Sequence, residues 1–238
     1  EVVIKTAYSS INYKDALALT GKGKIVRTWP MVPGIDFAGT VVESRNPAYA
    51  PGTKVVLTGW SVGEKYWGGY SRFQRVKSEW LVPLPSGYTT RQAMMVGTAG
   101  FTGMLCVLAL ERAGVTPASG PVLVTGAAGG VGSVAVAILS RLGYSVTALT
   151  GDPAKEVYVK DLGASAVANG PEWAESARPL EAQKWAGAVD TVGSKVLARV
   201  LAEMDYNGVV AACGLAGGAD LPTTVMPFIL RAVKLVGV

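Results

Sequence analysis

The segment most informative about chemistry is a glycine-rich stretch from Val122 to Gly132, which reads VLVTGAAGGVG. It predicts an apolar strand, a tight turn and then an apolar helix. Gly129 and Gly130 would let the backbone approach a pyrophosphate, and Gly132 would let the helix pack against the strand. A helix N-terminus offers free N–H groups to phosphates. The context predicts a dinucleotide site, although Ala127 occupies the first glycine place of the strict G-x-G-x-x-G fingerprint.

An ordinary turn in an α/β domain of another function is the alternative interpretation of this segment. The end of the next predicted strand then decides between NAD and NADP. An NAD enzyme tends to place a carboxylate about 20 residues beyond the glycines, to bind the ribose 2′-hydroxyl. This chain has Thr150 and Gly151 there, with Lys155 close enough to pair with a 2′-phosphate. NADPH is favoured, although the nearby carboxylate of Asp152 would oppose that phosphate.

Histidine is absent from all 238 residues, and the only cysteines are Cys106 and Cys213. Without imidazole, Ser-His-Asp and Cys-His catalysis are excluded, and two cysteines alone cannot build the usual structural zinc site. Both cysteines lie in apolar runs, which predicts small buried thiols, without a disulfide framework, in a reducing compartment. No metal is expected, and no two carboxylates form an evident general acid/base pair.

Composition and charge narrow the class of protein further. Half of the residues are hydrophobic and 16% are charged, which is typical of a chain with a large buried core. The net charge of +5 is scattered, so nucleic-acid binding is not expected. Residues 92–110 and 113–140 carry no charge, but glycines, threonines and prolines interrupt them. A buried α/β core explains these stretches better than membrane helices do.

Strands and helices are expected to alternate after residue 93. A helix capped by Thr90 runs toward Leu110. The predicted strands are 121–125, 145–149, 186–191, 208–213 and 233–238, and the predicted helices are 130–142, 154–162, 194–204 and 224–231. Strands flanked by helices at this spacing predict βαβ units and a parallel sheet buried on both faces. We therefore place a dinucleotide-binding domain at residues 94–238.

Residues 1–93 are predicted to form a mainly-β domain with one short helix at 12–19. Its expected strands are 2–7, 38–43, 54–58 and 69–76, separated by Pro-Gly turns. Both ends of the chain read as strands already under way, so we expect a fragment of a longer protein.

The sequence resembles the zinc-free, quinone-oxidoreductase-like branch of the medium-chain dehydrogenase/reductase family, and within it the bacterial acryloyl-CoA reductases. The resemblance covers essentially the whole chain in order. The segments that carry it are NYKDALA (12–18), GKGKI (21–25), PGIDFAG (33–39), LTGW (57–60), WGG (67–69), GTAGFT (97–102), VDTVG (189–193), ACGLAGG (212–218) and LPTTVMPFILR (221–231).

This resemblance implies a GroES-like catalytic domain at 1–93, followed by a Rossmann domain with a doubly wound parallel sheet at 94–238. The active site would lie in the cleft between them. In the family the chain returns to the first domain after the Rossmann sheet, and that return and the first strand are missing here. Zinc-binding relatives place a histidine where this chain has Ile35-Asp36.

The resemblance also implies a set of cofactor-binding residues. Tyr13 would lie near the nicotinamide, residues 128–131 would hold the pyrophosphate, and 150–152 would face the 2′-phosphate. Leu215 and Ile229 would line the nicotinamide side. The full set is Tyr13, Ala128, Gly129, Gly130, Val131, Thr150, Gly151, Asp152, Leu215 and Ile229. The family pattern has an arginine at position 152, so Asp152 is a departure.

The implied reaction is NADPH-dependent reduction of the activated C=C bond of acryloyl-CoA to propanoyl-CoA. The proton for the α-carbon would come from water, Tyr13 or Lys14, and the candidate catalytic residues are Tyr13, Asn12 and Lys14. Basic residues near this segment could meet coenzyme A phosphates or be solvated surface charge: Lys14, Lys22, Lys24 and Arg27.

Several polar residues have two interpretations. Asn12, Asp15, Asp36, Thr98 and Thr102 could orient substrate or cofactor, whereas Asp36 and Asp190 could equally hold turn N–H groups. A quinone or enone reductase of the same fold and a non-catalytic NADPH-binding protein are the alternative functions. We expect a cytoplasmic homodimer.

Overall fold

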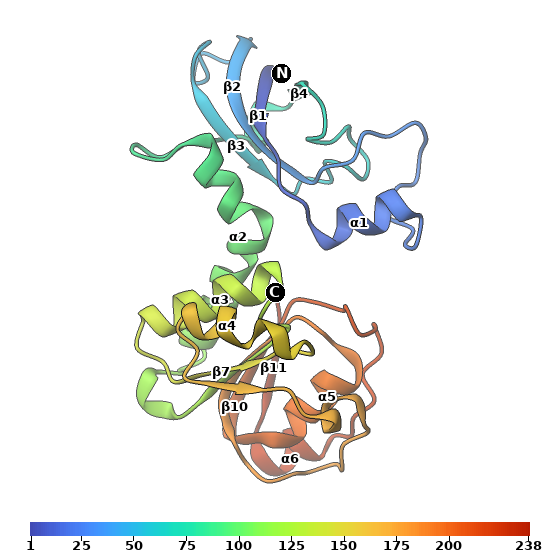
Figure 1. The fold of residues 1–238 in the computed structure, drawn as a ribbon. Helices are drawn as coiled ribbons and strands as arrows, with labels where there is room; N and C mark the ends of the chain where they lie inside the picture. Colours follow the sequence, from blue (N-terminus) through green and yellow to red (C-terminus); the bar gives the residue numbers. More distant parts are fainter. The chain divides into compact units, whose positions relative to one another are not determined.

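The computed structural model describes residues 1–238 and separates into two compact units, Glu1–Phe101 and Thr102–Val238 (Figure 1). Helix α2 (Thr90–Arg112) runs across the boundary between the units. It is interrupted at Gly97, where φ is 52° and ψ is −160°, so it consists of two helical segments joined at a kink. The domain boundary that we expect between residues 93 and 94 falls near the start of this helix and stays a prediction.

The first unit is built on a five-stranded antiparallel sheet with the order β4-β1-β2-β3-β5. Its strands are β1 (Val2–Tyr8), β2 (Asp36–Ser44), β3 (Lys54–Thr58), β4 (Phe73–Val76) and β5 (Val82–Pro83). Alternate residues of a strand point to opposite faces, and the inward set of these strands forms one apolar cluster around Ile4, Phe37 and Leu57. This sheet confirms the mainly-β character expected for the N-terminal part.

Helix α1 (Tyr13–Thr20) follows β1 and carries the first candidate catalytic residues. Its N-cap is Asn12, whose backbone N–H donates to the Asp15 carboxylate at 2.9 Å in a capping box. It ends at Gly21, which has the left-handed conformation (φ 67°) common at helix C-termini. The predicted helix at 12–19 is therefore confirmed within one residue at each end.

The second unit is built on a six-stranded parallel sheet with the order β11-β10-β9-β6-β7-β8. Its strands are β6 (Val122–Thr125), β7 (Val146–Leu149), β8 (Ala166–Ala168), β9 (Trp185–Asp190), β10 (Met204–Ala212) and β11 (Lys234–Gly237). The helices that follow strands are α3 (Gly130–Arg141), α4 (Glu156–Asp161), α5 (Ser194–Glu203) and α6 (Met226–Arg231).

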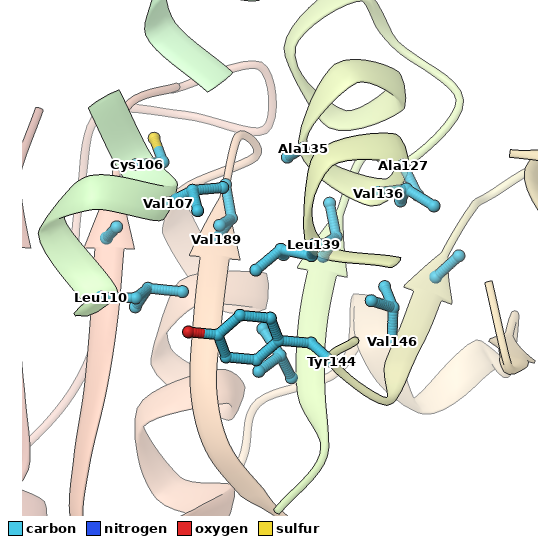
Figure 2. Packing of buried hydrophobic residues seen from close by; sticks show 14 of the residues in the cluster. Cys106, Val107, Leu110, Ala127, Ala135, Val136, Leu139, Tyr144, Val146 and Val189 are labelled. Atoms are coloured by element: carbon cyan, nitrogen blue, oxygen red, sulfur yellow. The ribbon is translucent and has the colours of Figure 1, made fainter. Parts of the chain in front are cut away.

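Both faces of this parallel sheet are buried. Val122 and Val124 of β6 belong to a cluster that also contains residues of α2 and α3, shown in Figure 2. Leu123, between them, belongs to a second cluster with residues of α5. Because neighbouring residues of a strand face opposite sides, helices cover both faces of the sheet. The predicted Rossmann architecture of the second unit, a doubly wound parallel sheet, is confirmed.

Several predicted boundaries were wrong for local reasons. The helix cap is Thr89, not Thr90, because the Thr89 hydroxyl accepts the N–H of Gln92 at 3.2 Å and the Gln92 side chain accepts the N–H of Thr89 at 3.0 Å. Strand β4 begins at Phe73 and not at Gly69, because the N–H groups of residues 68–70 donate to carbonyls of residues 32–34 and not to a strand ladder.

The second unit also contains elements that the pattern did not predict. Strand β10 begins at Met204, four residues early, and pairs with Trp185 before the register shifts near Asn207, which has a φ of 62°. The predicted helix at 154–162 opens as a 3-10 turn at Pro153–Lys155. The short strands β5, in the first unit, and β8, in the second, were missed, because two or three residues are too few to show a period.

One helix, α2, has the length and apolar composition of a membrane span. Its second segment nevertheless packs inside the protein, since Cys106, Val107 and Leu110 are all fully buried in the cluster of Figure 2. A core helix of an α/β unit passes the same test of length and hydropathy.

We predict that Leu139→Ala destabilises the second unit by about 2–5 kcal/mol, because it leaves a cavity under α3. The matched control is Leu142→Ala at the end of the same helix, since Leu139 is 0% exposed and Leu142 is 46% exposed. Urea unfolding followed by circular dichroism measures both. Equal destabilisation by the two variants would contradict the packing described for α3.

Candidate functional site

The glycine-rich turn between β6 and α3 is shaped by close approaches. Gly126 has a φ of 57°, and a Cβ on it would clash with the Thr191 hydroxyl. A Cβ on Gly132 would clash with the carbonyl oxygen of Gly126. Both positions therefore require glycine, and the packing role predicted for Gly132 is confirmed.

The N-terminus of α3 has the features of a phosphate site. Gly129 is its N-cap, and the Gly129 N–H donates to the Gly126 carbonyl at 2.8 Å, which closes the turn. The first N–H groups of a helix have no partner within the helix and point out of its end. Gly129 and Gly130 are exposed there, whereas Ala128 and Val131 are half-buried beside them. The four predicted pyrophosphate residues thus run without a break from the turn into the first residues of α3.

A buried hydrogen-bond network lies directly beneath this turn, at the carboxyl ends of β6 and β9. The fully buried Asp190 carboxylate accepts the Thr125 hydroxyl at 2.7 Å and the Gly193 N–H at 2.8 Å. Thr191 in turn donates its N–H to the Thr125 hydroxyl at 3.0 Å and its hydroxyl to the Thr125 carbonyl at 2.9 Å. Burial raises the pKa of Asp190. The structure confirms the predicted structural role of Asp190, which holds a turn N–H.

The turn after β7 contains the three residues expected to face a 2′-phosphate. Thr150 is buried, and its hydroxyl accepts the Asp152 N–H at 3.2 Å. Gly151 and Asp152 are exposed. The Asp152 carboxylate accepts the N–H of Ala154 at 2.9 Å and so caps the 3-10 turn that follows. Asp152 therefore has a local structural task, which the sequence did not indicate.

The two residues expected on the nicotinamide side, Leu215 and Ile229, lie on different elements and differ in exposure. Leu215 lies in the loop after β10 and is 53% exposed. That loop is tied to the end of β9, because the Gly217 N–H donates to the Val192 carbonyl at 2.7 Å. Ile229 lies on α6 and is 72% exposed, and its role stays a prediction.

Adjacent strands bring most of these residues together. The strands β10, β9, β6 and β7 are neighbours in the parallel sheet, and the turns after β6 and β7 and the loop after β10 all leave its carboxyl edge. In open parallel sheets this edge is where dinucleotides bind. The geometry of the second unit therefore fits a dinucleotide, with the pyrophosphate at the start of α3.

The first unit contains a second buried carboxylate, Asp36, at the start of β2. It accepts the Ser10 N–H and hydroxyl at 3.0 and 2.8 Å, the Asn12 amide at 3.0 Å, and the Thr98 N–H and hydroxyl at 3.0 and 2.8 Å. Asp36 thus joins the chain before α1 to the kink of α2 next to Gly97. It holds backbone N–H groups, as one of its two interpretations expected.

The three candidate catalytic residues stand in sequence at the start of α1 but differ in their contacts. The Asn12 amide is held by Asp36 and by the Ser10 hydroxyl, both at 3.0 Å. Lys14 forms an ion pair with Glu64 at 2.7 Å. Tyr13 is 56% exposed at the first position of the helix. They lie in a different unit from the glycine-rich turn, and their joint role stays a prediction.

Sequence reasoning missed Tyr70 and Ser10 in this cluster. The Tyr70 hydroxyl donates to the Ser10 carbonyl at 3.1 Å. Burial raises the pKa of Tyr70 to about 12, and the Asp15 and Asp36 carboxylates add to the effect. The sequence feature that could have indicated this contact is the pair Gly68-Gly69. A Cβ on either residue would clash with a carbonyl oxygen of the 33–36 segment, so these two segments of the chain lie in close contact.

Comparison with known families finds a match for each of the two units. Residues 1–86 match the family described as alcohol dehydrogenase GroES-like domain, and residues 130–238 match the family described as zinc-binding dehydrogenase. The probable acrylyl-CoA reductase AcuI of Escherichia coli is 62% identical over 238 residues, which cover 100% of this chain and 73% of that protein. The chain belongs to the medium-chain dehydrogenase/reductase family.

Two further relatives extend this comparison. The acrylyl-CoA reductase AcuI of Ruegeria pomeroyi is 59% identical, covering 100% of this chain and 72% of that protein. The putative quinone oxidoreductase YhfP of Bacillus subtilis is 49% identical, with the same coverage of 100% and 72%. The family assignment therefore holds for relatives with two different named activities.

Solved structures of family members match over the full chain. The structure of E. coli K-12 YhdH with bound NADPH has a TM-score of 0.97 and 62% identity, covering 100% of this chain and 73% of that one. The structure of B. subtilis YhfP with NAD bound has a TM-score of 0.94 and 49% identity, covering 100% and 72%. Dinucleotides of both kinds are thus bound by members of the family with this fold.

This family member lacks the side chains for a zinc site. No group of three or more His, Cys, Asp or Glu residues is gathered anywhere in residues 1–238. The resemblance puts the histidine of zinc-binding members at Ile35-Asp36, and both of these residues are buried here. Asp36 instead accepts hydrogen bonds from neutral donors.

We predict that Asp190→Asn changes how the free energy of unfolding depends on pH. Because the pKa of Asp190 is raised, the folded protein binds this proton more tightly than the unfolded chain does. The stability from the neutral carboxyl is full at acidic pH and is lost as the pH rises through the folded-state pKa. Asparagine does not titrate, so the stability of the wild type relative to the variant should fall with rising pH and then level off.

The measurement is urea unfolding of both proteins between about pH 4 and pH 8. Asp161→Asn, which removes an exposed carboxylate in the same unit, controls for the loss of one charge. Parallel stability curves for wild type and Asp190→Asn would show that the network does not hold a carboxyl with a raised pKa.

Proposed function

We propose that this protein catalyses the NADPH-dependent reduction of the activated C=C bond of acryloyl-CoA, giving propanoyl-CoA. The observation that carries the proposal is identity of 62% and 59%, over the whole of this chain, to two proteins named as a probable acrylyl-CoA reductase and an acrylyl-CoA reductase. The dinucleotide geometry at the carboxyl edge of the parallel sheet agrees with it. In an enzyme of this kind the nicotinamide carries the hydride chemistry.

The residues present fit the dinucleotide. The close approach at Gly126 and the exposed Gly129 and Gly130 leave the start of α3 accessible to a pyrophosphate. Thr150 is neutral where an NAD enzyme tends to carry an acid, and Lys155 is exposed in the following turn. When bound, NADPH supplies the hydride that reduces the β-carbon of the acryloyl thioester.

The chain must then stabilise negative charge on the thioester oxygen and deliver a proton to the α-carbon. Lys14 is engaged by Glu64 at 2.7 Å, which favours the exposed Tyr13 hydroxyl as the donor. Asn12 acts as a positioning residue. Its side-chain amide donates to Asp36, which fixes the start of α1, where Tyr13 is the first residue. In this proposal Lys14, paired with Glu64, is not the proton donor.

A quinone reductase is the second candidate, favoured by the 49% identity to a putative quinone oxidoreductase. Both reactions oxidise NADPH, so absorbance of the reduced nicotinamide reports either one. The deciding experiment compares steady-state kcat/KM for acryloyl-CoA and for a small quinone. Faster turnover of the quinone would overturn the proposed substrate, and NADPH binding without turnover of either would leave a binding protein.

We further propose a cytoplasmic location and a homodimer. The two cysteines are free thiols, as fits a reducing compartment. Strand β11 lies at the edge of the parallel sheet, and an edge strand has backbone groups available for pairing with another chain. Light scattering coupled to size-exclusion chromatography measures the oligomeric state.

We predict that Tyr13→Phe lowers the turnover number by about 100-fold or more and leaves NADPH affinity nearly unchanged, because it removes a proton donor but keeps the ring. The measurement is steady-state kinetics with acryloyl-CoA and fluorescence titration with NADPH. Tyr88→Phe is the matched control, since Tyr88 in the same unit is 55% exposed and Tyr13 is 56% exposed.

The variant Tyr13→Ala separates the remaining roles of this ring. If the ring only packs on the nicotinamide, Phe is almost silent and Ala weakens NADPH binding. If it is a structural aromatic, Ala lowers the melting temperature and NADPH affinity is preserved in the folded fraction. An unchanged turnover number in Tyr13→Phe rules out the catalytic role.

We predict that Asp152→Arg strengthens NADPH binding by about tenfold and leaves NADH binding unchanged, because a guanidinium pairs with a 2′-phosphate and a carboxylate repels it. Asp152→Asn is the control, since it removes the charge but can still accept the Ala154 N–H. It should give a smaller gain. If both variants bind NADPH as the wild type does, position 152 does not face the phosphate.

A further inference from the structure

The loop after β3 gathers large aromatic side chains on the surface of the first unit. Trp60, Tyr66 and Trp67 are 56%, 46% and 61% exposed. Single exposed apolar residues are normal on a protein surface, whereas several large exposed rings in one short loop are typical of a binding surface. None of these rings has a part in the catalytic and cofactor-binding roles proposed above.

Two of these rings pack on a third that belongs to the core. Trp80 is 7% exposed and is part of the apolar cluster of the antiparallel sheet. Trp60 stacks on it, with ring planes 14° apart and ring centroids 6.0 Å apart, and Tyr66 is tilted against it at 4.8 Å. The buried Trp80 therefore fixes the plane of the Trp60 indole from one side. Because Trp60 is still 56% exposed, its opposite face is open to solvent.

The backbone that carries Trp60 has an unfavourable conformation. Trp60 and Ser61 have φ angles of 55° and 59°, which bulky side chains rarely adopt. The loop is held in place because the N–H groups of residues 64–66 all donate to the Ser61 carbonyl, at 3.2, 2.9 and 3.2 Å. Backbone strain of this kind persists only where the surroundings impose it, and it is concentrated at ligand sites. The strain therefore points to a functional position for the Trp60 indole.

This loop is fixed next to the start of α1, where the candidate catalytic residues lie. The Gly59 N–H donates to the carbonyl of residue 35 at 3.2 Å. The N–H groups of residues 34 and 35 in turn donate to the Asp15 carboxylate of α1 at 3.1 and 3.0 Å. The ion pair of Lys14 with Glu64 at 2.7 Å is a second link between α1 and the loop. The aromatic loop and the start of α1 thus belong to one surface region of the first unit.

Positive charge accompanies the aromatic rings. The Lys77 ammonium lies 5.4 Å from the centroid of the Trp80 ring. Its ion pair with Glu79, at 3.8 Å, joins two exposed side chains, so it is weak and leaves Lys77 available to an anion. Lys65, next to Tyr66 in the loop, is exposed. An open ring face with ammonium groups nearby is suited to a purine ring that carries phosphates.

We propose that Trp60 binds the adenine ring of a coenzyme A thioester by stacking, with Lys65 and Lys77 attracting the attached phosphates. The inference rests on the proposed acyl-CoA substrate and assigns the part of the first unit that binds its nucleotide end. The pantetheine arm separates the adenine from the thioester. Trp60 therefore contributes to affinity for the whole coenzyme A thioester and takes no part in the chemical step.

The experiment measures binding to the full chain by isothermal titration calorimetry. The protein is first saturated with NADP⁺, so that the dinucleotide occupies its own site. Coenzyme A is compared with pantetheine, which has the same thiol arm without the adenosine phosphates. We expect the wild type to bind coenzyme A more tightly than pantetheine. Trp60→Ala should bind coenzyme A about tenfold more weakly, as for the loss of one base stacked on an aromatic ring, and should bind pantetheine as the wild type does.

Matched variants separate stacking from folding, with the melting temperature of each measured by circular dichroism. Trp60→Phe keeps a ring face and should retain most of the affinity for coenzyme A. Phe73→Ala is the control, because Phe73 is 50% exposed on β4, which β1 and β2 separate from β3 in the sheet. It should bind coenzyme A as the wild type does. If Trp60→Ala does not fold, Trp60→Leu replaces it, since leucine fills much of the same space without a ring face.

The proposal is overturned if the wild type binds coenzyme A no more tightly than pantetheine, or if Trp60→Ala keeps wild-type affinity for coenzyme A. An increased KM of Trp60→Ala for a small quinone, with unchanged affinity for coenzyme A, would assign the ring to a quinone instead. The binding measurements need no turnover of acryloyl-CoA. A protein that binds coenzyme A through Trp60 but does not reduce acryloyl-CoA contradicts the proposed function alone.

Discussion

The hydrogen bond from the Thr125 hydroxyl to the buried Asp190 carboxylate is the contact on which the cofactor edge depends. It joins the carboxyl ends of β6 and β9, which are neighbours in the parallel sheet. The same carboxylate holds the Gly193 N–H, and the same hydroxyl accepts the Thr191 N–H. The Thr191 hydroxyl then leaves no space for a side chain at Gly126. The position of the glycine-rich turn is thus a consequence of one buried carboxylate and its neutral partners.

The first unit repeats this arrangement with other residues. Asp36 is fully buried and accepts hydrogen bonds from Ser10, Asn12 and Thr98, and none of these donors is charged. A buried carboxylate is costly unless its lone pairs are satisfied, and here backbone and side-chain donors satisfy them. In both units a carboxylate fixes the chain segments that carry the proposed chemistry and leaves the exposed groups to meet ligand.

Local features were predictable from the sequence and contacts between distant segments were not. The turn from Gly126 to Gly132 follows from a short pattern, and the alternation of strands and helices showed the parallel sheet. The Asp36 cluster joins residues 24 and 62 positions away, and no periodicity relates them. Asp152 was recognised as a departure, but its capping of the following turn depends on backbone geometry that a residue type alone does not specify.

Neutral partners around Asp190 have a consequence for the response to ionic strength. At 0.1 M salt, interactions between exposed charges more than about 10 Å apart are largely screened, whereas hydrogen bonds of a buried carboxylate to hydroxyl or amide dipoles are screened much less. Lys155, by contrast, is exposed in the turn beside the proposed 2′-phosphate position. Added salt would therefore weaken the attraction of a phosphate to that surface and leave the framework of the turn intact. In this protein the exposed Lys155 would attract the ligand, whereas the buried Asp190 network keeps the glycine-rich turn rigid.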